Sequence, residues 1–312
     1  MPLLDISQAA GLLSSGKLVA FATETVYGLG CDATNDLAVA SIYAQKGRPS
    51  FNPLIIHFAT LEAAKKHVEF SKNAETIAKL FWPGPLTLVL NRKPDSSVSK
   101  LCSAGGETLA VRIPRHQSAR DLISSANCPV AAPSANSSGK ISPTNERHVF
   151  NDFGEDFPVL KGGACEVGLE STVLDLSGTV IKILRPGSIT ADMIKEATGF
   201  GVEGACEAET PSHGAMKSPG QLTSHYAPKQ PVRINCEKPE ANEYFVAFGP
   251  SNYDHQFNLS ESGDLVEAAA NLFSALHEAN NSAFDRISFA PIPAHGIGIA
   301  INDRLTRAAA DR

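Results

Sequence analysis

Short apolar runs alternate with amphipathic segments along the first 200 residues, and this pattern predicts a mixed α/β fold. The runs at 17–22, 53–57, 86–90, 108–113 and 129–132 have the length and composition of buried strands. Apolar residues at helical spacing predict one helix capped by Asp5, a second capped by Asp36, and further helices at 61–68, 74–81 and 118–125. The stretches 23–34 and 91–106 are polar and contain glycine, so we expect a turn and a loop there.

Two further strand-like runs, at 168–176 and 179–187, flank a Ser-Gly turn and predict a β-hairpin. A helix at 190–197 would close the first unit. Strands and helices thus follow an irregular order with antiparallel neighbours. We therefore expect a twisted sheet with both parallel and antiparallel strands and with flanking helices.

The composition shifts after residue 200, where glycines and prolines replace the apolar periodicity. We assign a first domain to residues 1–200, a linker to 201–230 and a C-terminal domain to 231–312. The last domain has strand-like runs at 232–236, 244–248 and 287–290. It also has apolar residues at helical spacing from Leu265 to Leu276 and a final helix at 297–310. This alternation predicts a small Rossmann-like α/β domain with a parallel core.

Composition restricts the class of protein. A net charge of −6 over 312 residues argues against a protein that coats nucleic acid. The six cysteines are scattered and never form a C-x-x-C pair, which argues against a disulfide framework and suits a reducing compartment. The N-terminus shows no basic stretch followed by an apolar one, and no apolar run has membrane-spanning length, so we expect a cytoplasmic protein without membrane contact.

Cations and hydroxyl groups recur at predicted strand ends. The cations are Lys46, Arg48, Arg112 and Arg185, and the polar partners are Ser134, Asn136, Ser142, Thr144 and Ser171. Together they suit a triphosphate and a carboxylate, because arginine grips such anions with two parallel hydrogen bonds. Each arginine taken alone is more simply a surface residue or half of an ion pair, and His57 alone is more simply a core histidine.

Familiar nucleotide and metal motifs do not account for these groups. Residues 28–33 match G-x-G-x-x-A, but no acidic residue lies about 20 positions further on to hold a ribose. Neither Gly-Lys pair is followed by Ser or Thr, which excludes a Walker A loop. H-E-x-x-H is absent too, so we expect no dedicated metal site. Mg²⁺ held mainly by the phosphates of ATP would leave no such signature.

Seven motifs then occur in order along the chain and carry a family resemblance. They are T-E-T-V-Y-G-L-G at 23–30, K-G-R-P-x-x-N-P-L-I-x-H at 46–57, A-V-R-x-P at 110–114, P-S-A-N-x-S-G-x-x-S-P-T at 133–144, G-L-E-S-T-V-x-D at 168–175, L-R-P-G at 184–187 and S-P-G-x-x-x-x-H-Y-A-P at 218–228. In this order they resemble the threonylcarbamoyl-AMP synthase family, in the two-domain form whose catalytic domain is YrdC-like. The closing D-R-L-T-R-A-A-A at 303–310 resembles the accessory domain of that form.

The resemblance implies an enzyme that combines L-threonine, bicarbonate and ATP into threonylcarbamoyl-AMP and pyrophosphate. The product would pass to a downstream tRNA threonylcarbamoyl transferase, and we expect at most weak contact with tRNA itself. By motif position, the threonine site would use Thr25, His57, Arg112 and Ser171. The ATP site would use Arg48, Asn52, Thr108, Asn136, Thr144, Arg185 and, from the linker as part of a lid, Tyr226. The reaction centre would use Lys46, Arg48, Ser134 and Asn136.

Three positions depart from the family pattern: Ala22 replaces a frequent proline, Ser50-Phe51 replaces a more polar pair, and Ser224 replaces a basic residue. The last change makes Tyr226 the main candidate for a ligand contact from the linker. Two other functions stay open at this point. One is a related ATP-dependent carbamoyl-transfer enzyme, which usually carries extra domains, and the other is a non-catalytic RNA-binding module, against which the acidic balance counts.

Overall fold

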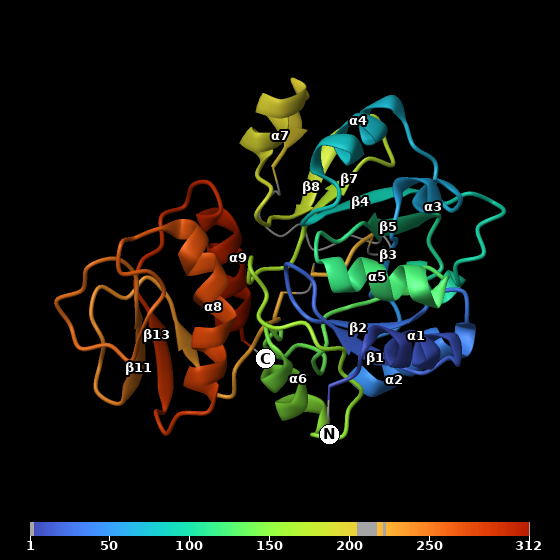
Figure 1. The fold of residues 1–312 in the computed structure, drawn as a ribbon. Coiled ribbons are helices and arrows are strands. Elements are labelled where there is room, and N and C mark those ends of the chain that lie inside the picture. The colour runs from blue at the N-terminus through green and yellow to red at the C-terminus, as the bar shows by residue number, and fades with distance from the viewer. Residues whose placement is uncertain (1–2, 205–216, 221–222, 312) are drawn as a thin grey trace.

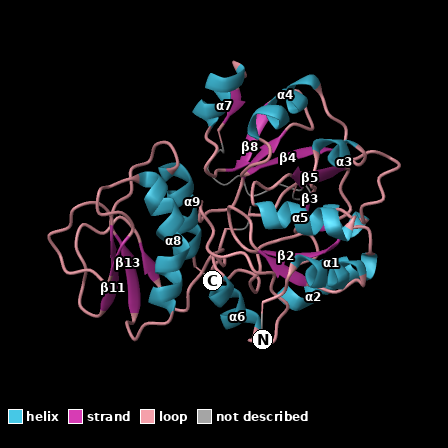
Figure 2. Cartoon of the chain, in the orientation of Figure 1, coloured by secondary structure: helices cyan, strands magenta, loops and turns pink. Residues whose placement is uncertain are grey.

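The computed structural model describes residues 3–204, 217–220 and 223–311. Their N-terminal part is built on one sheet with the strand order β1-β2-β6-β3-β5-β4-β7-β8-β9 (Figures 1 and 2). Its strands are β1 (Val19–Phe21), β2 (Gly28–Asp32), β3 (Ile55–His57), β4 (Leu86–Asn91), β5 (Thr108–Arg112), β6 (Val130–Ala131), β7 (Thr172–Asp175), β8 (Ile181–Arg185) and β9 (Val202–Glu203). β3 pairs with β5 in parallel, whereas β4 and β5 are antiparallel, so the sheet is mixed as the sequence predicted.

Helices cover both faces of this sheet because successive side chains of each strand point to opposite sides. Val19 and Phe21 of β1 pack with α1 (Ile6–Ser14) and α5 (Gln117–Ala126), while Ala20 belongs to the core on the other face. Residues from the helices on that second face complete its core. These helices are α2 (Asp36–Lys46), α3 (Leu61–Lys65), α4 (Lys72–Phe81), α6 (Glu146–Phe153) and α7 (Ala191–Thr198).

The C-terminal part has a smaller sheet with the order β10-β13-β11-β12, in which every pair is parallel. Its elements are β10 (Val232–Arg233), β11 (Glu243–Ala247), β12 (Phe257–Asn258), α8 (Leu265–Asn280), β13 (Arg286–Phe289) and α9 (Gly298–Ala309). In Figure 1, α8 and α9 stand between this sheet and the N-terminal unit. The parallel core predicted for this part is confirmed.

The two units share an apolar cluster. Val26, Ile141 and Leu169 of the N-terminal unit pack with buried residues of α8 and α9. Gly168 comes so close to α8 that a Cβ atom there would lie 2.5 Å from the Cα atom of Ala270. A residue with a side chain could not occupy this position without moving a helix backbone.

The structure corrects two details of the predicted elements. The expected turn at 23–34 contains strand β2, which pairs with β1 and β6 although glycine disfavours strands. Gly30 fits there because a Cβ atom would lie 2.7 Å from the Phe21 ring. Asn35 rather than Asp36 caps α2, accepting from the amides of residues 37 and 38.

The sequence analysis also underestimated regular structure in two segments. The expected loop at 91–106 contains a short 3₁₀ helix, Lys100–Ser103, and α6 follows the motif at 133–144, where no helix was predicted. The predicted hairpin is present, because β7 and β8 pair antiparallel. None of the described helices is long and apolar enough to cross a membrane.

Candidate active site

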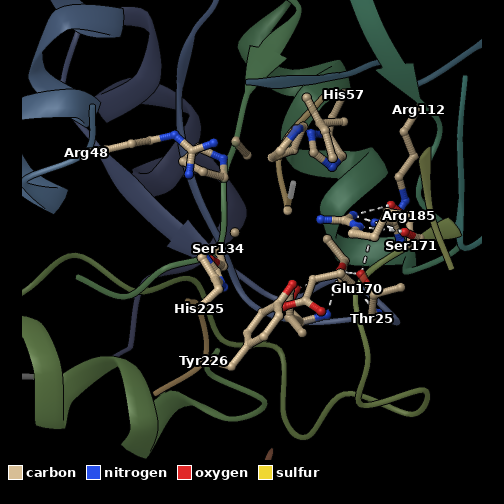
Figure 3. A pocket seen from close by; sticks show the side chains of 18 residues that line it. Thr25, Arg48, His57, Arg112, Ser134, Glu170, Ser171, Arg185, His225 and Tyr226 are labelled. Carbon is tan, nitrogen blue, oxygen red and sulfur yellow. Dashed lines mark hydrogen bonds between the residues drawn. The ribbon is translucent and has the colours of Figure 1, made fainter. Parts of the chain in front are cut away.

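A cavity lies where the loops after several strands of the large sheet meet the linker (Figure 3). We call it the central cavity. Its lining residues are Thr23, Thr25, Val26, Gly28, Arg48, Ile55, His57, Arg112, Ala132, Pro133, Ser134, Glu170, Ser171, Arg185, Pro219, Gly220, His225 and Tyr226. Eight of the residues assigned by motif position are among them: Thr25, Arg48, His57, Arg112, Ser134, Ser171, Arg185 and Tyr226.

Arg48 enters the cavity from the turn that ends α2. Gly47 takes a left-handed conformation there (φ 58°), which stops the helix and redirects the chain. The guanidinium donates to the backbone oxygen of Asn52 (3.2 Å), to its side-chain oxygen (2.6 Å) and to the Pro53 oxygen (3.0 Å). Burial lowers the pKa of Arg48 to about 10, so the group stays charged at neutral pH. Asn52 therefore fixes the direction of this cation.

Arg185, at the end of β8, is the second buried cation of the cavity. It donates to the backbone oxygen of Ser171 from Nε (3.1 Å) and to the Ser171 hydroxyl from Nη2 (3.1 Å). That hydroxyl also hydrogen-bonds with Thr87 of β4 (2.8 Å). The hairpin β7–β8 thus brings Ser171 and Arg185 together. Burial lowers the pKa of Arg185, which shows how costly this charge is without a partner anion.

Arg112, at the end of β5, is held by the T-E-T segment. Its Nη2 donates to a Glu24 carboxylate oxygen (2.6 Å) and its Nη1 to the Thr25 hydroxyl (2.9 Å). Glu24 also accepts from the backbone amide of Arg115 (2.9 Å). Burial opposes ionisation of Glu24, but Arg112 and these hydrogen bonds lower its pKa below the usual value. The pair presents one buried guanidinium face at a fixed place in the cavity wall.

Two histidines line the cavity as neutral rings. Burial lowers the pKa of His57 and of His225 to about 3 in each case. Their Nδ1 atoms are buried and have no hydrogen-bond partner among the described residues. A buried polar atom of this kind is normally satisfied, so both rings are suited to bind a ligand.

Lys46 acts on the loop at 133–144 rather than on the cavity surface. Its ammonium group donates to the backbone oxygen of Ser134 (2.6 Å) and to that of Asn136. Burial and the nearby Arg48 charge lower its pKa well below the usual value. Asn136 folds back on the same loop, donating to the oxygens of Ser137 and Lys140 (2.9 Å each). Of this predicted reaction-centre group, the structure places Arg48 and Ser134 in the cavity wall.

Three residues of the predicted ATP set also lie outside the cavity lining. Asn52 supports Arg48, as described above. Thr108 begins β5, the strand whose other end carries Arg112. Thr144 lies beside His148 (3.3 Å) and within 3.5 Å of the Ser274 hydroxyl of α8. Their contact with a nucleotide stays a prediction.

The structure adds residues that sequence reasoning did not assign, chiefly Glu170 and His225. Glu170 accepts a hydrogen bond from the Ser142 hydroxyl (2.5 Å) and is paired with Arg304 of α9 (3.0 Å). Burial opposes its ionisation, but Arg304 and Arg185 lower its pKa below the usual value. Both residues stand inside recognised motifs, next to Ser171 and Tyr226, so adjacency was the signal that could have revealed them.

The central cavity thus joins three buried arginines, two neutral imidazoles, hydroxyl groups and one ionised carboxylate under a linker segment. This is the site of an enzyme that binds small anionic substrates on a mixed α/β sheet. The comparisons with known proteins then identify the family. A sequence model of the family described as "Telomere recombination" matches residues 11–187, and one described as "Threonylcarbamoyl-AMP synthase, C-terminal domain" matches residues 189–310.

Curated relatives match over nearly the whole chain. The threonylcarbamoyl-AMP synthase of Bacillus subtilis is 39% identical, covering 99% of this chain and 94% of the relative. That of Pyrococcus abyssi is also 39% identical, covering 97% of this chain and 94% of the relative. The chain belongs to the threonylcarbamoyl-AMP synthase family, which confirms the resemblance drawn from the motifs.

Solved structures agree with this assignment. The crystal structure of P. abyssi Sua5 complexed with L-threonine matches with a TM-score of 0.89 and 38% identity, covering 97% of this chain and 94% of that chain. Escherichia coli YciO matches with a TM-score of 0.52 and 19% identity over 58% of this chain and 88% of that chain, which shows a shared fold. The predicted YrdC-like mixed sheet is therefore confirmed.

Proposed function

We propose that this protein forms L-threonylcarbamoyl-AMP and pyrophosphate from L-threonine, bicarbonate and ATP, for threonylcarbamoyladenosine modification of tRNA. One observation carries the proposal: the central cavity gathers Arg48, Arg112 and Arg185, each at least nine-tenths buried, in a chain whose relatives are threonylcarbamoyl-AMP synthases over their whole length. Guanidinium groups bind carboxylates and phosphates through parallel hydrogen bonds, and the proposed substrates supply a carboxylate and a triphosphate.

We assign threonine to the part of the cavity formed by Thr25, His57, Arg112 and Ser171. Arg112, oriented by Glu24, offers a charge for the amino-acid carboxylate, and the unpartnered Nδ1 atom of His57 offers a hydrogen-bonding group. The related P. abyssi protein was crystallised with L-threonine, which supports an amino-acid site in this fold.

We assign ATP to the part formed by Arg48, Arg185 and Tyr226. Asn52 belongs to this part as the residue that directs Arg48. Thr108, Asn136 and Thr144 join the proposed set by motif position. Tyr226 covers the cavity from the linker, and we propose that residues 201–230, of which 205–216 and 221–222 lie outside the described part of the chain, act as a lid between a catalytic domain (1–200) and an accessory domain (231–312).

The chemistry requires no protein nucleophile. The threonine amine adds CO₂ to give a carbamate, a carbamate oxygen attacks the α-phosphorus of ATP, and pyrophosphate leaves. Catalysis then rests on holding the two substrates together and on opposing the charge that grows on the transferred phosphoryl group. Arg48 and Arg185 are suited to the second task. Lys46 contributes by fixing the loop that carries Ser134.

ATP-dependent enzymes of this type use Mg²⁺, and the residues present fit a metal held mainly by phosphates. The described residues contain no group of three or more His, Cys, Asp and Glu side chains that could hold a metal ion. Glu170 supplies the carboxylate among the described lining residues, and it is already engaged with Ser142 and Arg304. Bound Mg²⁺ would neutralise phosphate charge, while the arginines orient the nucleotide.

We further propose that the protein acts in the cytoplasm, in keeping with its scattered cysteines, and passes its product to a tRNA threonylcarbamoyl transferase. The experiment that tests the function is pyrophosphate release with ATP, bicarbonate and each amino acid in turn. We expect release that requires both threonine and bicarbonate. Release with carbamoyl phosphate in place of threonine and bicarbonate would select the carbamoyl-transfer alternative, and tRNA binding without turnover would select an RNA-binding module.

A further inference from the structure

Arg304 of α9 is a buried cation that the proposed reaction does not yet use. It is fully buried, although it belongs to the C-terminal unit and lies outside the lining of the central cavity. Its Nε donates to Glu170 of the N-terminal unit (3.0 Å) and its Nη1 to the neighbouring Asp303 (2.6 Å). Burial opposes the charge, but Tyr226, Glu170 and Asp303 together raise its pKa above the usual value. The group is therefore always charged.

Arg304 contacts two residues of the cavity wall, and they come from different segments. Glu170 precedes Ser171, the residue that binds Arg185. Tyr226 comes from the linker, and its ring lies 5.5 Å from the Arg304 guanidinium carbon, in the range of a cation–π contact. One side chain of the C-terminal unit thus fixes both the loop before β7 and the linker.

The conformation of Tyr226 needs such support. Its backbone is in the left-handed region (φ 62°), which a bulky residue rarely adopts. The amide of His225 donates to the Arg307 oxygen of α9 (3.2 Å), and the amide of Ala227 donates to the Gly139 oxygen (2.9 Å). Residues 225–227 are therefore held between α9 and the loop at 133–144, and the Tyr226 ring contacts both Arg304 and Phe273.

A purely structural contact would not require a charge at this place. Burying a guanidinium is unfavourable unless it is well paired, and apolar residues often replace buried ion pairs without loss of stability. The Nη2 atom of Arg304 is also buried without a hydrogen-bond partner among the described residues, so the pairing is incomplete. We explain the buried charge of Arg304 by the two side chains that it orients, Glu170 and Tyr226.

We propose that Arg304 is a positioning residue for the active site: the C-terminal unit uses it to hold the Glu170 carboxylate in the cavity wall and the Tyr226 ring against the bound nucleotide. The expected effect on the kinetic constants rests on the proposed function. The placement of the two side chains rests on geometry alone. It gives the C-terminal unit a part in forming the active site.

The test compares Arg304→Met, Glu170→Gln, the double variant and Leu305→Ala in the full-length protein. Leu305 is the buried neighbour of Arg304 in the same helix, so its truncation matches the loss of packing. Threonine-dependent pyrophosphate release is measured well below the unfolding temperature. We expect Arg304→Met to lower kcat/KM for ATP at least about tenfold, while Leu305→Ala lowers stability and keeps the kinetic constants near those of the parent.

The double variant separates positioning from an independent effect. If Arg304 acts through Glu170, the double variant is no worse than the more damaged single variant, whereas independent losses multiply. Arg304→Lys keeps the charge but not the planar guanidinium, and we expect its kcat/KM for ATP to lie between the values of the parent and Arg304→Met. It replaces the Met variant in the test if that variant does not fold. Unchanged kinetics in Arg304→Met would overturn the proposal, and multiplied losses in the double variant would overturn the part of it that runs through Glu170.

Amide hydrogen exchange gives a readout that does not depend on turnover. We expect Arg304→Met to speed exchange at residues 224–227 and 139–142 more than Leu305→Ala does. Equal exchange in the two variants would refute the placement. A parent protein that releases no pyrophosphate would instead reject the proposed function, and the exchange comparison would still decide the role of Arg304.

Discussion

Arg48 shows how a single residue is prepared for its task. Three hydrogen bonds to Asn52 and Pro53 hold the guanidinium, and burial removes the water that would otherwise weaken its field. In the proposed function, the side chain would lose little freedom when the nucleotide binds. Such preorganisation is the main source of electrostatic catalysis.

The first prediction concerns this cation. Arg48→Ala should lower the rate of threonine-dependent pyrophosphate release by about 10²–10³-fold, by analogy with the loss of one preorganised donor. Asn52→Ala should have a smaller effect, because it frees Arg48 without removing its charge. Steady-state pyrophosphate assays measure both. Near-normal activity of Arg48→Ala would disprove the role assigned to Arg48.

The second prediction concerns the stacked histidines His148 and His277. The stacked rings of His148 and His277 lie 3.7 Å apart between α6 and α8, and burial lowers their pKa values to about 3 and about 4. Unfolded histidine binds a proton below about pH 6.5. Between pH 6.5 and about 4, these histidines bind more protons in the unfolded state than in the folded state. Their contribution to the unfolding free energy is therefore fully present above pH 6.5 and is lost as the pH decreases below that value.

Replacing one of these histidines should make the unfolding free energy depend less steeply on pH. In His148→Gln, the slope of unfolding free energy against pH near pH 5 should decrease by about 1.4 kcal/mol per pH unit. Urea unfolding at several pH values measures the slope. An unchanged slope would mean that His148 is protonated in the folded protein.

At the scale of elements, the contact of the G-L-E-S-T segment with α8 is decided by one glycine. Gly168 is left-handed (φ 70°), and a Cβ atom there would lie 2.5 Å from the backbone of α8. The same motif carries Glu170 and Ser171, so the cavity wall and the helix contact depend on the same few residues. A change at this glycine should therefore disturb both.

The third prediction compares two glycines with the same kind of backbone. Gly105 is also left-handed (φ 80°) but has open space around its Cβ position. Gly105→Ala should cost about 1 kcal/mol of unfolding free energy from strain alone. Gly168→Ala should cost about 2 kcal/mol more from overpacking and should lower activity as well. Chemical denaturation and the pyrophosphate assay check this, and equal costs would show that α8 can move aside freely.

At the scale of the whole molecule, the N-terminal unit and the C-terminal unit share one interface. Val26, Ile141 and Leu169 join the apolar cluster of α8 and α9, and the Arg304–Glu170 pair lies beside it. Domains move independently unless their interface is large and hydrophobic. Here the interface also reaches the wall of the central cavity, because Arg304 contacts the lining residues Glu170 and Tyr226.

The fourth prediction follows from this shared cluster. Calorimetry of the parent protein should show one cooperative transition, because neither unit can unfold without exposing the apolar residues of the other. Leu169→Asp, which places a carboxylate inside the cluster, should separate the transition into two. Two transitions in the parent would show that the interface is too weak to couple the units.

Much of this protein was determined by its sequence alone. Helix caps, apolar periodicity and turn residues are local, so most helices, the β7–β8 hairpin and the parallel C-terminal sheet could be predicted from them. The motifs likewise indicated the family and most of the residues that line the central cavity. Strand β2 was missed because its glycines argue against a strand, and only the fit of Gly30 beneath Phe21 shows why they are there.

What the tertiary structure decided is which side chains meet. Arg304 and Glu170 are 134 positions apart, and no local pattern joins them. Their pairing, the left-handed Tyr226 and the approach of Gly168 to α8 depend on how α8 and α9 pack on the N-terminal unit, which is set by contacts over long distances in the sequence. The sequence therefore determined the elements and the family, whereas packing decided that the C-terminal unit contacts two residues of the cavity wall, Glu170 and Tyr226.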